Sequence, residues 1–390
     1  MTESPRTVGE VRAVAGMRVL LVVFQWNEGG GLESVTREVA RSLGALGAAV
    51  EVWSVRQSGE IAAEGIVARG RAPAGRAARS LDARWLWRRR LERAMAREAG
   101  RFDLVIAGHP WLLPAVHAGL GDGPRRPPCW VWAYGIDVWG EPGRRLAPHL
   151  GWADRVAAIS RFTRDEVAPW VRPERLSLVH TPVDIAAFTP GPAAPGADLL
   201  VVGRLARDEA YKGHDVLFRS LPHLETSLGR RVILRVVGDG DWRPELEREA
   251  MALGVADRVD FAGRLPFAEL LDAYRGCGVF AMPSRVDRRP RGLWTGEGLG
   301  IVYLEAQACG RPAIASTEGG APDAVLPGET GLLADPRDPR ALADAAATLL
   351  SDPARASEMG TRGRRWVEES FSVDRFRVRL GGLLQLPPTR

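Results

Sequence analysis

Short apolar runs separated by turn-forming residues recur along the whole chain. The first of them, residues 18–25, is apolar almost throughout rather than alternating, which is typical of a strand buried on both faces of a parallel sheet. Glycines follow it, and then apolar residues return at helical spacing (Leu32, Val35, Val39 and Leu43). Further strands are predicted at 50–55, 103–108, 129–134, 155–160 and 176–183. A strand, a glycine loop and a helix form the first unit of a doubly wound α/β domain.

The same alternation starts again in the second half. Strands are predicted at 198–205, 232–238, 258–263, 278–283, 312–316 and 330–334, with helices at 243–253 and 338–350 among those between them. A stretch rich in Pro, Gly and Ala at 189–196 reads as a linker. We therefore predict an extension at 1–16, a first domain at 17–190, a second at 191–370 and a C-terminal segment at 371–390. The fold class is α/β, with two Rossmann-like doubly wound domains facing across a cleft.

Composition agrees with a two-domain protein of 390 residues and sets limits on its class. No apolar run approaches the length that spans a bilayer, and the first residues lack the layout of a secretory signal. Cys129, Cys277 and Cys309 lie far apart, so neither a zinc site nor a disulfide framework is indicated. We therefore expect a cytoplasmic protein.

The cationic residues are unusual because only one of them is a lysine. Of 53 Lys and Arg residues, Lys212 alone is lysine, and the net charge is +5. Codon bias explains an arginine-dominated chain in general. The remaining lysine is a candidate for a crowded phosphate site, because a compact ammonium fits where a planar guanidinium does not.

Candidate chemistry is concentrated between Gly296 and Gly310. Gly296, Gly298 and Gly300 alternate and then lead into an apolar helix that ends at Gly310. Free N–H groups and the positive end of the helix dipole meet at such a helix start, which favours an anion. Glu297 and Glu305 flank this position and suit hydroxyl groups. A diphosphate with a sugar on each side, that is, a nucleotide sugar, fits this arrangement.

Glu297 and Glu305 reproduce the E-x7-E pattern, and Gly319-Gly-Ala-Pro-Asp-Ala-Val325 follows downstream. Over this window the chain resembles the retaining glycosyltransferases of family 4, which have the two-domain GT-B fold. The resemblance implies that Arg204 and Lys212 bind the donor diphosphate and that the final helix returns to the first domain. Asp208 and Glu209 make the loop between these two cations longer than the common family pattern.

The resemblance also assigns the remaining donor contacts and adds a sugar contact. Gly30 and Gly31 let the first domain's backbone approach the diphosphate, and the segment at Arg264 and Leu265 contacts the base mainly through its backbone. His109, at the end of an apolar strand, is either a structural histidine or a contact of the transferred sugar. The complete set of expected site residues is Arg204, Lys212, Glu297 and His109 as catalytic, and Gly30, Gly31, Gly203, Arg264, Leu265, Gly298, Leu299, Gly300, Ile301, Val302 and Glu305 as donor-binding.

The acceptor is specified more loosely. Asp137 and Arg285 are the expected acceptor-side residues, although a histidine common in relatives is replaced by Tyr134. Arg285 opens a run of four arginines just before Glu297, and this run looks most like phosphatidylinositol mannosyltransferases. The stretch from Arg69 to Arg101 interleaves arginine with Trp85, Trp87, Leu91 and Met95. It is either a solvated surface helix or a basic face on the inner, anionic side of a membrane, and no nucleic-acid partner is expected.

The expected activity is metal-independent, retaining transfer of a hexose from GDP-mannose or a UDP-sugar to a hydroxyl of an acceptor sugar, glycolipid or small molecule. A lipid-linked or anionic acceptor would explain the arginine-rich segments. No cofactor and no metal ion are expected, since no aspartate pair has metal-ligand spacing. Four alternatives remain: a phosphorylase, a nucleotide-sugar epimerase, a non-catalytic nucleotide-sugar-binding module and an NAD-dependent oxidoreductase. The last would need a complete G-x-G-x-x-G fingerprint after Gln25, which is missing.

Overall fold

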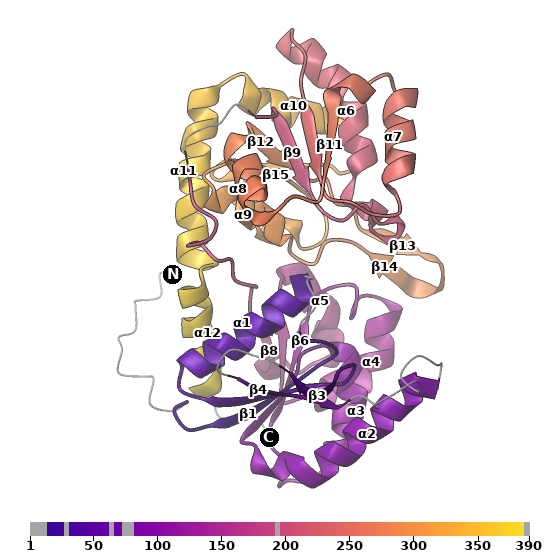
Figure 1. Ribbon diagram of the computed structural model, residues 1–390, viewed down its shortest axis with the longest axis vertical. Helices are drawn as coiled ribbons and strands as arrows, with labels where there is room; N and C mark the ends of the chain where they lie inside the picture. The colour runs from indigo at the N-terminus through magenta and orange to yellow at the C-terminus, as the bar shows by residue number, and fades with distance from the viewer. Residues whose placement is uncertain (1–13, 27–30, 62–65, 72–81, 192–195, 386–390) are drawn as a thin grey trace. The chain divides into compact units, whose positions relative to one another are not determined.

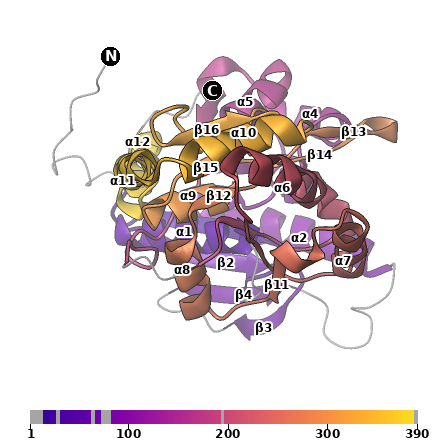
Figure 2. The same cartoon turned by 90° about the horizontal axis from the view of Figure 1, so that it is seen from above.

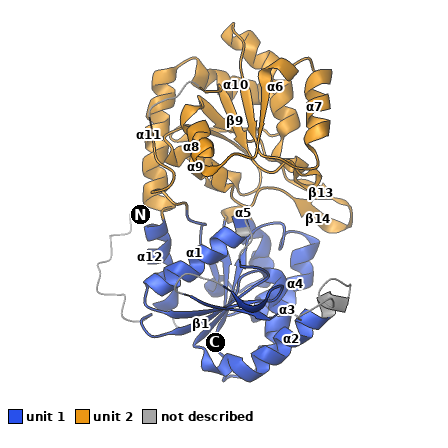
Figure 3. Ribbon diagram, in the orientation of Figure 1, with its two compact units in different colours: residues 1–159, 163–182, 373–390 blue, residues 160–162, 183–372 orange. Residues whose placement is uncertain are grey.

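The computed structural model describes residues 14–26, 31–61, 66–71, 82–191 and 196–385. Contacts between Cα atoms divide the chain into two compact units (Figure 3). Unit 1 comprises residues 1–159, 163–182 and 373–390, and unit 2 comprises 160–162 and 183–372. The predicted extension at 1–16 lies mostly outside the described residues, as does Gly30.

Unit 1 is built on an eight-stranded sheet (Figure 1). In spatial order its strands are β3 (Ser58–Ile61), β4 (Val67–Arg71), β2 (Ala49–Ser54), β1 (Arg18–Val23), β5 (Leu104–Ala107), β6 (Cys129–Ala133), β7 (Arg155–Ala158) and β8 (Leu176–Leu178). Neighbouring strands are parallel except for β3 and β4, which are antiparallel. The apolar run that predicts β1 is explained by its central position, because Val19 to Val23 are all buried.

Helices connect these strands. They are α1 (Gly31–Ala45), α2 (Asp82–Glu98), α3 (Leu113–Leu120), α4 (Glu141–Trp152), α5 (Arg161–Val167) and, from the end of the chain, α12 (Val373–Gln385). α12 packs on α1, and α2 packs on α3. The second contact is close, since a Cβ on Gly119 would lie 2.5 Å from Cβ of Met95. Residues from the C-terminal end of the chain thus complete unit 1.

Unit 2 holds a six-stranded parallel sheet. Its spatial order is β11 (Val259–Gly263), β10 (Leu234–Val237), β9 (Leu199–Val202), β12 (Val279–Ala281), β15 (Ala313–Ser316) and β16 (Gly331–Ala334). This is the 3-2-1-4-5-6 order of a Rossmann domain. Its helices are α6 (His214–Leu228), α7 (Arg243–Ala252), α8 (Phe267–Gly276), α9 (Ile301–Ala308), α10 (Pro339–Leu350) and α11 (Pro353–Ser370). α6 lies beside α10, and α9 lies beside α8 and α11 (Figure 2).

The predicted fold class is therefore confirmed in both halves, but some elements differ. The strand expected at 176–183 ends at Leu178, and β3 and β4 are absent from the prediction. A two-stranded antiparallel hairpin, β13 (Asp287–Arg289) and β14 (Leu293–Thr295), was also not predicted. Its first strand consists entirely of charged residues, so it has none of the apolar periodicity that the other strands show.

Candidate functional site

In unit 2 the candidate site lies where the parallel strands end. The N–H of Gly203, after β9, donates to the carbonyl of Val237 on β10, and the N–H of Gly238 donates to the carbonyl of Gly263 on β11. These bonds keep the three strand ends level. Ligands of doubly wound sheets bind outside the carboxyl ends of the strands, and β9 and β12 are the neighbours at which the strand order reverses.

Arg204 and Lys212 come together there on a carboxylate that the sequence analysis assigned no role. The turn at Arg207–Lys212 places Glu209 between them, and Glu209 is only 8% exposed. One of its oxygens accepts from the guanidinium of Arg204, and the other lies 2.5 Å from Nζ of Lys212. Lys212 lies along the strand end, since a Cβ on Gly203 would sit 3.1 Å from its Nζ. Two cations are thus held at one point by a shared counter-charge.

The glycine loop supplies the third part of this cluster. Gly300 precedes α9 with φ of 85°, and a Cβ there would lie 2.3 Å from the ring of Tyr303, so this position requires glycine. The carboxylate of Glu297 accepts from the backbone N–H groups of Gly298 and Gly300 and interacts electrostatically with Lys212. Burial raises the pKa of Glu297, while Lys212 opposes this rise. The predicted anion site, its lysine and its first glutamate therefore lie together.

Glu305 lies within α9, and its side chain has a hydrogen-bond partner that we did not predict. The hydroxyl of Tyr274 on α8 donates to Oε2 of Glu305 at 2.6 Å. Burial raises the pKa of Glu305 to about 7, and the Tyr274 hydrogen bond counteracts the rise. One carboxylate oxygen, Oε2, thus accepts from Tyr274.

The other expected donor residues, except Gly30 and Gly31, belong to unit 2 and lie after β11 or around the start of α9. Gly263 ends β11 with φ of 71°, and Arg264 and Leu265 follow it, the first exposed and the second half-buried. In the glycine loop and the first turn of α9, Leu299 is buried, and Gly298, Ile301 and Val302 are half-buried. Gly31 opens α1 in unit 1, where it is exposed.

His109 lies just after β5 in unit 1, at the N-cap of the next turn, and presents a defined tautomer. Its Nδ1 accepts the N–H of Trp111 at 3.1 Å, and burial, together with Arg56, lowers its pKa to about 4. At neutral pH the ring is therefore uncharged with its proton on Nε2. The imidazole packs against two aromatic rings, those of Phe24 and Tyr134, with centroid distances of 5.2 Å and 6.4 Å. In this state Nε2 donates a hydrogen bond and cannot accept a proton.

Asp137 lies in the loop that follows the neighbouring strand β6, which ends at Ala133. Its Oδ2 accepts the N–H of Tyr134 at 3.2 Å, and the residue is 8% exposed. Its Oδ1 and the hydroxyl of Tyr134 are both buried without a hydrogen-bond partner among the residues that the structure describes. Burial raises the pKa of Asp137 to about 6. Unit 1 therefore carries a donor at His109 and unpaired polar atoms at the ends of adjacent strands.

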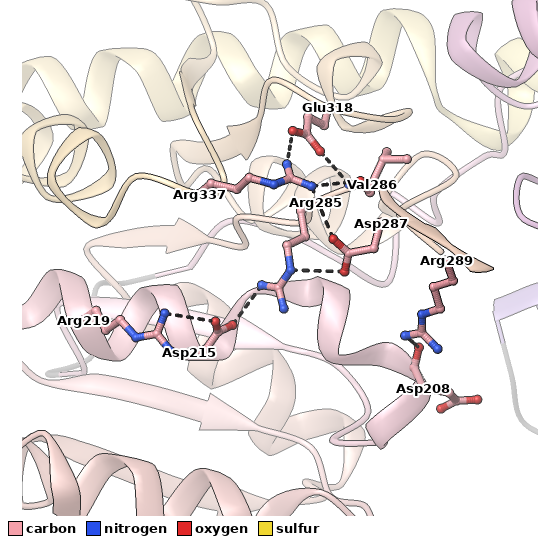
Figure 4. A network of polar contacts seen from close by, with 9 residues as sticks. All are labelled: Asp208, Asp215, Arg219, Arg285, Val286, Asp287, Arg289, Glu318 and Arg337. Carbon is pink, nitrogen blue, oxygen red and sulfur yellow. Dashed lines mark hydrogen bonds and ion pairs between the residues drawn. The ribbon is translucent and has the colours of Figure 1, made fainter. Parts of the chain in front are cut away.

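Arg285 is engaged in a structural network (Figure 4). Its guanidinium contacts Asp215 at 3.0 Å and Asp287 at 3.2 Å, and Arg337 contacts Asp287 at 3.3 Å as well as Glu318. Glu318 also accepts the N–H of Val286 at 2.6 Å. The acceptor contact of Arg285 stays a prediction and would have to compete with these two carboxylates, through which the arginine also holds the base of the hairpin.

The arginine-rich stretch at 69–101 forms a strand and a helix where it is described. On α2, Leu91 and Met95 are buried, whereas Arg88, Arg89, Arg90, Arg93 and Arg97 are exposed. Trp87 is half-buried and packs edge-on against Phe24 at 5.8 Å. This tryptophan therefore lies against unit 1, and the exposed face is formed by arginines. None of the helices described is both long and apolar enough to cross a bilayer.

The described residues contain no group of three or more His, Cys, Asp or Glu side chains placed to hold a metal ion.

Sequence reasoning missed Glu209 and Tyr274. Glu209 lies in a charged loop, where a single glutamate is unremarkable, and Tyr274 is 31 positions from Glu305. The only available signal was the extra length of the loop that contains Glu209.

Two Rossmann-like units, one with paired cations and a glycine-led helix at its strand ends, define a GT-B type glycosyltransferase architecture. Models of two protein families match the chain: Glycosyltransferase Family 4 over residues 29–187 and Glycosyl transferases group 1 over 191–366. The chain belongs to the family 4 glycosyltransferases with the GT-B fold, as the resemblance predicted.

Known proteins extend this result. A GDP-mannose-dependent alpha-(1-6)-phosphatidylinositol monomannoside mannosyltransferase of Mycolicibacterium smegmatis is 42% identical over 60% of this chain and 62% of its own length. A D-inositol 3-phosphate glycosyltransferase of Acidothermus cellulolyticus is 33% identical over 67% and 62%. The match thus spans less than two thirds of these relatives. Sucrose-phosphate synthase of Thermosynechococcus elongatus shares the fold, with a TM-score of 0.74, 20% identity and coverage of 94% and 98%.

Proposed function

We propose that this protein is a retaining hexosyltransferase that uses a nucleotide-diphosphate sugar, with GDP-mannose favoured over UDP-sugars. The observation that carries the proposal is the meeting of Arg204, Lys212 and Glu297 at the start of α9. Two cations and a helix N-terminus suit a diphosphate, and a carboxylate beside them suits the hydroxyls of the attached sugar. The GDP-mannose dependence named for the 42% identical relative favours this donor.

The reaction follows from the charges of these groups. The acceptor oxygen attacks the anomeric carbon on the face of the leaving group, and the bond from that carbon to the phosphate oxygen breaks. The acceptor proton passes to the departing phosphate oxygen, so no protein nucleophile is required. Arg204, Lys212 and the N–H groups at the start of α9 stabilise the charge on the diphosphate, without a metal ion or cofactor. Glu297 orients the sugar, and Glu305 binds the ribose through Oε1.

For the acceptor we propose a molecule that contains an inositol phosphate. The names of both relatives contain it, lipid-linked in one and free in the other. The strand ends of unit 1 offer groups that bind polyol hydroxyls: Nε2–H of His109 donates, and Oδ1 of Asp137 accepts. Trp111 and Ile136, which are 42% and 45% exposed, add apolar surface beside them.

We further propose that the protein works on the cytoplasmic side of the membrane and contacts anionic lipid through the arginines of α2. Five exposed arginines on one helix, whose described side chains Leu91 and Met95 are buried in the domain, provide attraction to anionic headgroups. The contact is therefore peripheral and weakened by salt.

The test is to incubate the purified 390-residue chain with GDP-mannose, UDP-glucose or UDP-galactose, and with phosphatidylinositol vesicles or soluble inositol phosphate. We expect nucleotide release that depends on donor and acceptor, and an α-linked product in the proton NMR spectrum. Glu297→Gln serves as the inactive control. Donor binding without any release of nucleotide would instead identify a non-catalytic binding module, and a β-linked product would exclude retention.

A further inference from the structure

The β13–β14 hairpin is the segment of unit 2 that sequence reasoning did not foresee, and it joins β12 to the glycine loop. β14 ends at Thr295, and only Gly296 separates it from Glu297. On its other side, the guanidinium of Arg289 reaches the carbonyl oxygen of Asp208 at 3.5 Å, in the turn that carries Glu209 and Lys212 (Figure 4). The hairpin is thus attached to the donor site at both of its edges.

The base of the hairpin is fixed by charge. Asp287, the first residue of β13, contacts both Arg285 and Arg337, and the carboxylate of Glu318 holds the N–H of Val286. Four charged side chains and one backbone group therefore lock the point from which the hairpin leaves the domain. Such networks restrict motion more than single surface ion pairs do.

The tip of the hairpin has the opposite character, because its arginines lack carboxylate partners. Arg288, Arg289 and Arg291 are exposed, and none forms an ion pair within the described part of the chain. Arg288 stacks over Trp294 at 4.4 Å, its cross-strand neighbour. Arg291 is the one non-glycine residue with positive φ among those described, at 64°. Strain and an unbalanced charge at one turn are features that a ligand can compensate.

We propose that this hairpin is an acceptor-recognition arm whose tip binds the phosphate ester of the acceptor through Arg288 and Arg291. Guanidinium groups present paired N–H donors that match phosphate oxygens, and the stacked Arg288 is held in place by its ring. The short link to Glu297 puts this phosphate at the sugar end of the donor, where the acceptor hydroxyl must arrive. This inference rests on the proposed function, which it deepens by naming an acceptor-binding element.

The test uses the double variant Arg288→Gln with Arg291→Asn in the 390-residue chain. Asn tolerates the left-handed backbone at position 291, and Arg289 is left intact because it touches the donor loop. The control variant, Arg340→Gln with Arg355→Gln, removes the same charge from exposed positions on α10 and at the start of α11 that likewise lack ion pairs. Thermal unfolding verifies that both variants fold.

Two kinds of measurement decide the outcome. Binding of soluble inositol 1-phosphate is followed by calorimetry, which needs no turnover, and KM values are measured for donor and for acceptor. We expect the hairpin variant to bind inositol phosphate about tenfold or more weakly and to show an acceptor KM raised by about the same factor. Its donor KM should stay within about twofold of the wild-type value. The control variant stays at wild-type values.

Unchanged inositol phosphate binding, or an equal loss in the control variant, overturns the proposal, as does an equal increase in donor KM. Vesicles of phosphatidylinositol are compared with phosphatidylcholine vesicles in the same assays. A loss with soluble and lipid-linked phosphate alike supports phosphate recognition, whereas a loss restricted to vesicles shows a membrane contact and overturns it. If the wild-type chain releases no nucleotide from any donor, the proposed function fails, while the calorimetry still decides the hairpin.

Discussion

Lys212 is the residue whose replacement tests the site most directly. Its ammonium is held over Gly203 by Glu209, and its side chain is 13% exposed. Lys212→Ala should lower kcat by about 10²–10³-fold, the loss typical of removing one preorganised donor to a developing oxyanion, or roughly 2.7–4 kcal/mol. Donor affinity should fall by less than about tenfold, because Arg204 and the α9 N-terminus still bind the ground-state diphosphate.

The space around Lys212 allows the effect of its charge to be distinguished from the effect of its shape. The stem of Lys212 lies against the Cα of Gly203, where a Cβ would be 3.2 Å from Cδ. A planar guanidinium at the end of such a confined stem cannot take the place of the ammonium. Lys212→Arg should therefore keep less than about a tenth of the wild-type kcat, even though the charge is retained.

The assay is steady-state release of nucleotide, with donor Kd from calorimetry and thermal unfolding as the check on folding. Arg207→Ala is the matched control, since Arg207 lies in the same turn but pairs with Glu245. It should leave kcat within about twofold of wild type. Near-normal turnover of Lys212→Ala would remove Lys212 from the site, and a fully active Lys212→Arg would refute the argument from shape.

Other residues of unit 2 give further predictions. Because burial raises the pKa of Glu305 to about 7, donor affinity should fall as the pH drops through 7 and the carboxyl becomes protonated. Tyr274→Phe removes the hydrogen bond that lowers this pKa, so the pH midpoint of the affinity change should shift upward. Calorimetric titration with donor at roughly pH 5.5 to 8.5 measures both midpoints. A midpoint that moves down contradicts this assignment. Glu209→Gln should tighten binding of GDP or UDP by about fivefold, roughly 1 kcal/mol, and leave binding of the free nucleoside unchanged, because the carboxylate competes with the diphosphate for two cations. Weaker diphosphate binding would show that Glu209 mainly holds these cations in place. Gly300→Ala should lower the free energy of unfolding in urea by more than about 2 kcal/mol, because the new Cβ would clash with Tyr303. Gly229→Ala, at a φ of 66° with open space around it, should lower it by only about 1 kcal/mol. Equal losses in the two variants would show that the clash with Tyr303 does not contribute.

The central strands and the grouping of the candidate site residues around α9 were predictable because their signals are local. Residues such as Val19 to Val23 are buried on both faces of the sheet, so the sequence must be apolar at each of them. Glu297, the glycines and Glu305 belong to one loop and one helix, so their spacing fixes their geometry. Gly310, with φ of 76°, confirms the predicted end of that helix.

The features that were missed depend on contacts between distant segments. Tyr274 reaches Glu305 from another helix, and Arg285 meets Asp215 across 70 positions. No local pattern records such pairs. The hairpin strands escaped because their residues are held by antiparallel pairing and ion pairs rather than by burial of an apolar face.

The arrangement of charge in unit 2 leads to a last prediction. At the candidate donor site the cations Arg204 and Lys212 share Glu209, so part of their charge is balanced before a diphosphate arrives and less of their field extends into solvent. At the hairpin tip the guanidinium groups have no carboxylate partner in the described chain, so their field extends into solvent and is screened by salt. Binding of inositol phosphate should therefore weaken more steeply with NaCl between 50 and 500 mM, on the order of tenfold, than binding of the nucleoside diphosphate does. Calorimetry across this range measures both slopes, and a steeper slope for the nucleoside diphosphate would mean that Glu209 does not balance the donor site.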